Sequence, residues 1–238
     1  AIAFLGSGFN EQCSIYVGVN ANAQKIATQE IDTLLEAYSE TELSEAILEA
    51  RNDKAHWFLY VHLPDRTLVY DAAASAATQQ PVWHILTTSV QEFEQYRARN
   101  FVWINSEWIG GDPQEARTCK LVETISSHYG SPVRWEFATQ LIYNEGRGAT
   151  FNELELVALT GSVAFGDSPR ITTSYTLDGV TWSVDSSISA GTTGQRAKRL
   201  VWFRQGHMRN WRAQRFRGDS DAHMAVARLE GRLTPLNW

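Results

Sequence analysis

The side chains with the greatest chemical potential in this sequence form a basic run near its C-terminal end. Aromatic residues, Trp202, Phe203, Trp211 and Phe216, alternate with the basic ones. Arginines beside aromatic rings can contact phosphates and stack on bases, and they can equally anchor a protein interface. The basic residues are Arg196, Lys198, Arg199, Arg204, Arg209, Arg212, Arg215 and Arg217.

Strand geometry limits what these arginines can do together. On a strand with period two, Arg215 and Arg217 share a face with Trp211, whereas Arg212 lies on the opposite face with Phe216. The pattern therefore does not predict a single nucleic-acid groove, and pairing within the fold, a protein interface, a DNA-facing surface and plain solvation all stay open. The candidate partner- or DNA-facing residues are Arg199, Arg204, Arg209, Arg212, Arg215 and Arg217.

The second chemical candidate is the segment Ser174–Trp182, which resembles the Asp-box hairpin of sialidases and other propellers. Asp178 and Gly179 form a typical turn pair, and Trp182 follows at the spacing of that box. The Asp position of the box holds Leu177, and even a complete Asp-box is a fold element. Asp178, Gly179 and Trp182 are therefore interpreted as structural hairpin residues.

No residue pattern indicates an enzyme. A glycosidase needs two carboxyl groups across a cleft, whereas Glu40, Glu42, Glu45 and Glu49 read as an exposed acidic face. The six histidines show no metal-binding spacing, and Cys13 and Cys119 show no C-x-x-C pattern, so neither a zinc site nor a disulfide is indicated. We expect no catalytic residues, no metal and no cofactor.

The elements that must position these residues are mainly strands. The nine Trp, eight Tyr and ten Phe residues favour pleated, half-buried surfaces. Residues 56–63 alternate with period two, a Pro-Asp turn follows, and residues 67–70 return as a second strand, with residues 82–86 as a third. Trp57, Tyr60 and Tyr70 are the structural residues of this hairpin, and Trp57→Ala should cost about 3 to 5 kcal/mol if its ring is buried.

One short amphipathic helix is predicted over residues 28–38. Residues 41–53 are ambiguous, because a capping-box pattern at residues 39–42 competes with alternation, and context favours a strand. In the last third, residues 171–175 and 181–187 flank the Asp178 turn, and residues 199–205, 210–217 and 222–229 are predicted to form a meander.

The fold class that follows is mainly β, with propeller-like antiparallel blades and one short helix near the N-terminus. Two pairs of tryptophans, Trp57 and Trp103, and Trp135 and Trp182, lie about one blade period of ~40 to 50 residues apart. A sandwich remains possible. The chain divides by charge: residues 1–149 carry 10 Lys/Arg against 19 Asp/Glu, and residues 150–238 carry 11 against 8. We expect acidic blades in 1–149 and Arg/Trp-rich terminal blades in 150–238, continuous with the first part.

Several strings together resemble a known family, the packaged-DNA stabilisation proteins, which are tail hub or nozzle proteins of short-tailed enterobacterial phages. The resemblance spans residue 26 to the end of the chain. It is carried by residues 26–32, 57–64, 66–71, 178–182 and the Arg/Trp-rich end through 221–225. Members of the family are longer, so a chain that begins at Ala1 is expected to be a C-terminal part.

The resemblance implies a structural virion protein, assembled in the host cytoplasm and located in the tail. It implies a homohexameric ring that closes the portal channel, retains packaged double-stranded DNA and links the portal-proximal tail adaptor protein to the tail needle, with the tailspike as a further possible neighbour. The alternative is a sialidase-like or carbohydrate-binding β-propeller.

Overall fold

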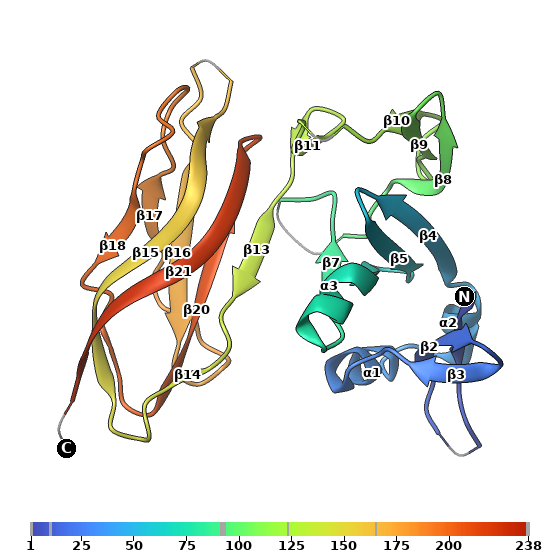
Figure 1. The fold of residues 1–238 in the computed structure, drawn as a ribbon, viewed down its shortest axis with the longest axis horizontal. Helices are drawn as coiled ribbons and strands as arrows, with labels where there is room; N and C mark the ends of the chain where they lie inside the picture. The colour runs from blue at the N-terminus through green and yellow to red at the C-terminus, as the bar shows by residue number, and fades with distance from the viewer. Residues whose placement is uncertain (1, 10, 91–93, 123, 165, 237–238) are drawn as a thin grey trace. The chain divides into compact units, whose positions relative to one another are not determined.

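The structure is a computed structural model that describes residues 2–9, 11–90, 94–122, 124–164 and 166–236, so Ala1 lies outside the described residues. The chain forms two compact units, Ala1–Leu121 and Val122–Trp238, which are coloured blue to green and green to red in Figure 1. The expected division after residue 149 differs from this one. Residues 135–138 and 142–143 belong to the second unit because they pair with one of its strands.

The first unit consists of three antiparallel sheets, with strand orders β1-β2-β3, β4-β5-β6-β7 and β10-β9-β8. Its strands are β1 (Ile2–Gly6), β2 (Ser14–Val19), β3 (Asn22–Lys25), β4 (Ile47–Asp53), β5 (His56–His62), β6 (Thr67–Asp71), β7 (Trp83–Leu86), β8 (Arg99–Ile104), β9 (Glu107–Gly111) and β10 (Thr118–Lys120). The hairpin and third strand predicted from residues 56–86 are confirmed, and β4 extends that meander to four strands.

Three hairpins of this unit share one two-residue turn. Both central residues have positive φ in Asn20–Ala21, Lys54–Ala55 and Asn105–Ser106. Positive φ at both positions is the type I′ geometry, whose twist matches that of the flanking strands. The turn at Asn105–Ser106 separates β8 from β9.

Three short helices lie in the first unit: α1 (Gln29–Leu35), α2 (Glu40–Ser44) and α3 (Ala72–Thr78). The helix predicted over residues 28–38 is confirmed as α1, with Ile31 and Leu35 buried. Both readings of residues 41–53 hold in part, since Ser39 and Glu42 form a capping box at the start of α2 and the strand β4 follows it. The small-residue segment between β6 and β7 forms α3, and the Asp71 side chain caps this helix by accepting a hydrogen bond from the Ala74 N–H.

The core of the first unit is aliphatic. Its buried members come from β2, α1, β5 and β6 and the residues next to them, namely Ile15, Ile26, Ile31, Leu35, Leu59, Val61, Leu63 and Leu68. Trp57, by contrast, has 60% of its surface exposed. The expected burial of this ring is wrong, because Trp57 lies at the solvent-facing start of β5.

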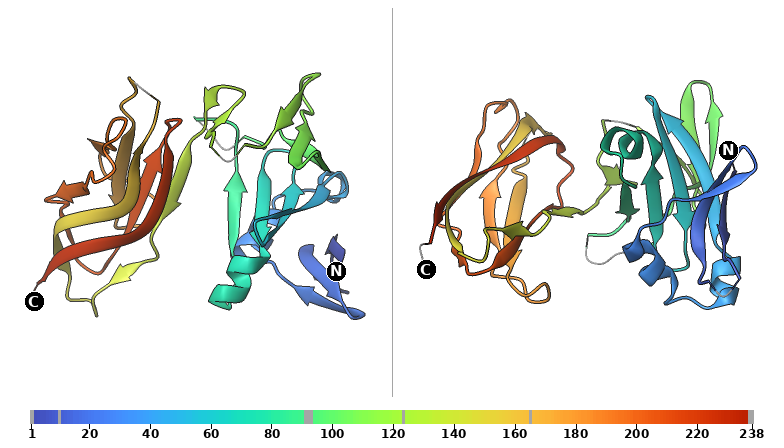
Figure 2. Two further views of the ribbon diagram at one scale, coloured as in Figure 1. Left: turned by 45° about the horizontal axis from the view of Figure 1, so that its top comes forward. Right: turned by 60° about the horizontal axis from the view of Figure 1, so that its bottom comes forward.

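Besides the short β11-β12 hairpin, the second unit is a sandwich of two sheets, which Figure 2 shows from two sides. One sheet has β15 at its centre, paired with β18, β19 and β21, and the other has the order β13-β20-β16-β17, with β14 also on β20. The strands are β11 (Ser127–His128), β12 (Ser131–Pro132), β13 (Trp135–Ala138), β14 (Ile142–Tyr143), β15 (Ala149–Ser162), β16 (Arg170–Thr176), β17 (Ser186–Ser189), β18 (Leu200–Phe203), β19 (His207–Met208), β20 (Trp211–Gly218) and β21 (His223–Pro235).

The predicted meander of the last three strands is wrong. Residues 199–205, 210–217 and 222–229 do contain strands, but β18 and β21 pair with opposite edges of β15, whereas β20 lies in the other sheet. The reason is the core between the sheets. Leu156 and Trp202 from one sheet pack against Ile171 and Phe216 from the other, which requires β18 and β20 to lie in different layers.

Candidate interaction surface

The six predicted arginines do not form one surface, because four of them are occupied within the second unit. Arg199 Nε donates to Glu155 Oε1 over 2.8 Å, and its guanidinium also pairs with Glu153. Arg217 forms an ion pair with Asp185. Arg212 and Arg215 lie against aromatic rings. Pairing within the fold, one of the readings left open, is what the structure shows for these four.

Arg212 is fully buried, with 0% of its surface exposed. Its guanidinium carbon lies 4.1 Å from the centre of the Phe151 ring and 3.7 Å from that of Tyr175. Its Nε donates to Gln214 Oε1 over 3.0 Å, and another guanidinium nitrogen donates to the Gln205 carbonyl over 2.5 Å. Burial lowers the pKa of Arg212 to about 10, which leaves it charged at neutral pH. This side chain stabilises the core and cannot reach a partner.

Arg215 connects the Asp178 hairpin to β20. Its guanidinium carbon lies 4.0 Å from the centre of the Trp182 ring, and its Nε donates to Ser174 Oγ over 3.2 Å. The hairpin itself is fixed by Asp178, whose carboxylate accepts hydrogen bonds from the backbone N–H groups of Val180 and Thr181. These two N–H groups, followed by the Thr176 hydroxyl, hold the pKa of Asp178 well below its usual value. The Asp178 carboxylate therefore stabilises its own turn.

Arg204 and Arg209 differ from the other four. Both are exposed, and within the described part of the chain neither forms an ion pair. Arg204 has a φ of 55°, an uncommon value for a residue with a side chain. Its N–H donates to the Asn152 carbonyl over 2.8 Å, which holds this backbone in place. Together with Thr150 and His207, Arg204 lines an open depression of about 490 Å³.

The chain brings four segments together around Arg204, at one end of the sandwich. The peptide N–H of Phe151 bonds to the Gly206 carbonyl, and that of Leu236 bonds to the Gly148 carbonyl. Tyr143 pairs with Trp211, and a side chain at Gly179 would lie 3.7 Å from the Trp211 ring. We call this end the loop-end surface. Its exposed side chains include the acidic Glu145 and Asp178 and the apolar or basic Tyr143, Arg147, Val180, Phe203, Arg204, His207 and Arg209.

The loop-end surface combines apolar and basic character. Tyr143, Val180 and Phe203 are 66%, 82% and 65% exposed. Exposed aromatic and aliphatic side chains next to arginines are typical of protein interfaces, in which such residues act as anchors. Sequence reasoning found Arg204 and Arg209 but missed Tyr143, Phe203 and Val180 as surface residues, since only the pairing of distant strands brings these loops together.

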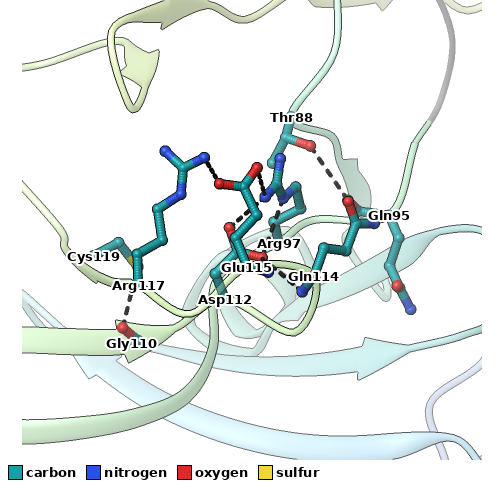
Figure 3. Close-up of polar contacts among 9 residues, drawn as sticks. All are labelled: Thr88, Gln95, Arg97, Gly110, Asp112, Gln114, Glu115, Arg117 and Cys119. Carbon is teal, nitrogen blue, oxygen red and sulfur yellow. Dashed lines mark hydrogen bonds and ion pairs between the residues drawn. The ribbon is translucent and has the colours of Figure 1, made fainter.

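The first unit contains a separate polar cluster around the turn that precedes β10 (Figure 3). Asp112 is bound by Arg97 through two hydrogen bonds of 3.2 and 2.6 Å, and Glu115 pairs with both Arg97 and Arg117. Burial alone would raise the pKa of Asp112, but the Gln114 N–H and Arg97 hold it below its usual value. The Asp112 carboxylate is held ionised and accepts N–H groups of its own turn, so this cluster is best explained as stabilising the turn.

The hairpin residues of the first unit lie in different environments. Tyr60 is buried, and Arg51 Nε donates to its hydroxyl over 3.0 Å. Tyr70 packs against Trp83, with ring centres 5.2 Å apart. Trp57 lies near the half-buried Trp108, because Trp108 Nε1 donates to the carbonyl of Asn52, the cross-strand neighbour of Trp57.

The described residues contain no cluster of three or more His, Cys, Asp or Glu side chains that could hold a metal ion. Among the described helices, none is long and apolar enough to span a membrane. Both Cys13 and Cys119 are free thiols.

Comparison with known proteins assigns a family to each unit. The family model described as bacteriophage P22 Gp10, beta-propeller, matches residues 1–126, and the model described as bacteriophage P22 Gp10, beta-sandwich, matches residues 134–234. The chain is also 28% identical over 207 residues to tail hub protein gp10 of Salmonella phage P22. That alignment covers 87% of this chain and 42% of the relative, so the chain spans less than half the length of that relative.

These matches confirm the resemblance to the family of tail hub proteins. They confirm a mainly β fold with a propeller assignment for the first unit. The terminal blades expected in residues 150–238 are corrected to a sandwich, because β15 and β20 lie in two sheets that share one core. The Asp-box-like hairpin thus belongs to a sandwich and not to a propeller blade.

Proposed function

Because this chain belongs to the bacteriophage P22 Gp10 family, we propose that it is a structural component of a short phage tail that acts by assembly and not by chemistry. The observation that carries the proposal is the match of both units, in the same order, to the two domains of that family. In the finer form of the proposal, copies of the chain form a homohexameric ring. The ring closes the portal channel and retains the packaged DNA.

The proposed neighbours are the portal-proximal tail adaptor protein and the tail needle, with the tailspike as a further one. The protein would be assembled into the tail in the host cytoplasm and remain in the virion. The loop-end surface supports a role in assembly, since Phe203 and Val180 expose apolar area that a protein partner would remove from water. The Arg212 and Arg215 contacts support a rigid scaffold behind that surface.

The proposal is tested by genome retention. Phage particles are assembled with and without this protein, and nuclease-protected DNA is measured after purification. Particles without the protein should lose most of their packaged DNA. Stable retention in its absence would contradict the proposal.

A matched pair of variants sharpens this test. Phe203→Ser alters the loop-end surface, whereas Thr193→Ser alters a residue at the other end of the sandwich, where Thr193 bonds to the Val163 carbonyl. DNA retention should fall with the first variant and not with the second. Equal retention in both would show that the loop-end surface has no part in assembly.

A further inference from the structure

The two units differ in charge, and the loop-end surface lies in the more basic one. Residues 1–121 carry 8 Lys/Arg against 16 Asp/Glu, whereas residues 122–238 carry 13 against 11. At the loop-end surface, Arg147, Arg204 and Arg209 outnumber the exposed acidic groups, which are Glu145 and the internally bonded Asp178. An acidic partner is therefore favoured at this end.

The first unit contains an acidic segment that spans the two short helices α1 and α2. Residues 26–50 contain seven acidic residues and no Lys or Arg. Three of the seven are occupied: Asp32 pairs with Lys25, Glu42 closes the capping box, and Glu49 accepts the N–H of Asn100. The other four are exposed, and within the described ranges they form no ion pair; they are Glu30, Glu36, Glu40 and Glu45. We call these four the α1–α2 acidic face.

We propose that the loop-end surface of one copy docks on the α1–α2 acidic face of the next copy. The inference rests on the proposed self-assembly and names the surfaces that carry it. Because the two faces are different, the contact is heterologous, so it repeats from copy to copy and closes into a ring when the rotation permits. Apolar side chains such as Phe203 favour a protein surface over a phosphate backbone, because DNA offers mainly charged groups at its exterior.

A heterologous contact permits a complementation test. One variant, Arg204→Glu with Arg209→Glu, reverses the loop-end charge, and a second, Glu36→Lys with Glu40→Lys, reverses the acidic face. In either variant alone, the two surfaces of the contact carry charges of the same sign, so self-association should weaken by about tenfold or more. A 1:1 mixture should restore it, because each reversed face then meets an opposite charge. Lys198→Glu, an exposed basic residue outside the loop-end surface, is the control.

The measurement is sedimentation equilibrium of the full chain at concentrations up to about 100 µM, with circular dichroism showing that each variant is folded. Wild-type association should weaken as salt rises from about 0.05 to about 0.5 M. A monomeric wild type, a mixture without restored association, or an equal effect of Lys198→Glu would overturn the contact. If the chain does not associate through this contact but particles without the protein still lose their DNA, the contact is wrong and the proposed function is still supported.

Discussion

The two units of this protein use the same kind of residue in different ways. In the sandwich, Trp202 and Phe216 are buried side by side, with ring centres 5.5 Å apart, and Arg212 lies between two further rings. In the first unit the buried core is aliphatic, and Trp57 and Trp103 are more than half exposed. Aromatic residues therefore predict strands in both units, but they do not predict whether the rings are buried or exposed.

The difference follows from layering. The strands β15 and β21 of the sandwich are 14 and 13 residues long, and a second sheet covers the inner face of β15. The strands of the first unit are shorter, and three of its hairpins have two-residue turns. Trp57 lies near the exposed start of the short strand β5, so most of its ring faces solvent. Exposed rings of this kind are available for contacts with other proteins.

The largest effect expected from this comparison is that of Trp202→Ala. The ring is 2% exposed and its Nε1 donates to the Ser186 carbonyl, so the substitution removes packing and leaves an acceptor unpaired. We expect a loss of about 3 to 5 kcal/mol in the free energy of unfolding of the second unit. Trp57→Ala, its exposed counterpart, should cost less than about 1 kcal/mol. Equal shifts of the denaturant midpoint in the two variants would contradict the different burial of Trp202 and Trp57.

A second difference concerns pH. His62 is buried in the first unit, where its Nδ1 bonds to Thr67 and its Nε2 lies 3.7 Å from a Glu49 oxygen. Burial, followed by the charge of Arg99, lowers its pKa to about 4. The unfolded chain then binds the proton more tightly, so stability is lost as pH falls from about 6.5 to about 4, by about 3 kcal/mol.

The matched variant for this effect is His62→Gln, which keeps an amide for Thr67 and does not titrate. Urea unfolding of the first unit between pH 7 and pH 4 should show a smaller pH dependence in the variant. An unchanged pH dependence of stability would show that other groups cause it. His84 would be examined first, because burial also lowers its pKa.

Arg212 tests whether a buried cation stabilises the sandwich. Arg212→Ala leaves the Gln205 carbonyl and Gln214 without their donor and opens a void between Phe151 and Tyr175. We expect a loss of about 2 to 3 kcal/mol in the free energy of unfolding, measured by guanidinium titration. Arg196→Ala, an exposed residue, is the control and should be nearly neutral. A neutral Arg212→Ala would show that the ring contacts contribute nothing.

The smallest effect is local. Asp178→Ala removes the acceptor for the Val180 and Thr181 N–H groups, so hydrogen exchange at these two amides should accelerate while the core of the sandwich is unaffected. Since the pKa of Asp178 is lowered in the fold, the same loosening should occur in the wild type only in acid, below the usual pKa of an aspartate. Unchanged exchange in the variant would show that the turn is held by its backbone alone.

Local signals in the sequence predicted local structure. The alternation around Tyr60, the turn at Asp178 and the helix ending near Leu35 are each set by residues close in sequence, and each is confirmed. The type I′ turns escaped prediction because Lys54–Ala55 and Asn105–Ser106 contain no glycine, the usual sign of positive φ.

The loop-end surface could be predicted only in part. Arg204 and Arg209 stood out by residue type, but so did four other arginines. Only the fold shows that those four are occupied by acidic or aromatic partners; they are Arg199, Arg212, Arg215 and Arg217. That pairing joins residues far apart in sequence, such as Leu154 and Trp202, and it is decided by the fit of side chains in the core.

The most direct test of assembly through the loop-end surface is a cryo-electron microscopy map of phage tails that contain this chain. The account predicts a closed ring in which Phe203 and Arg204 of each copy are buried against the α1–α2 acidic face of the next. A map in which these side chains face solvent, or in which the chain is absent from the tail, would contradict it.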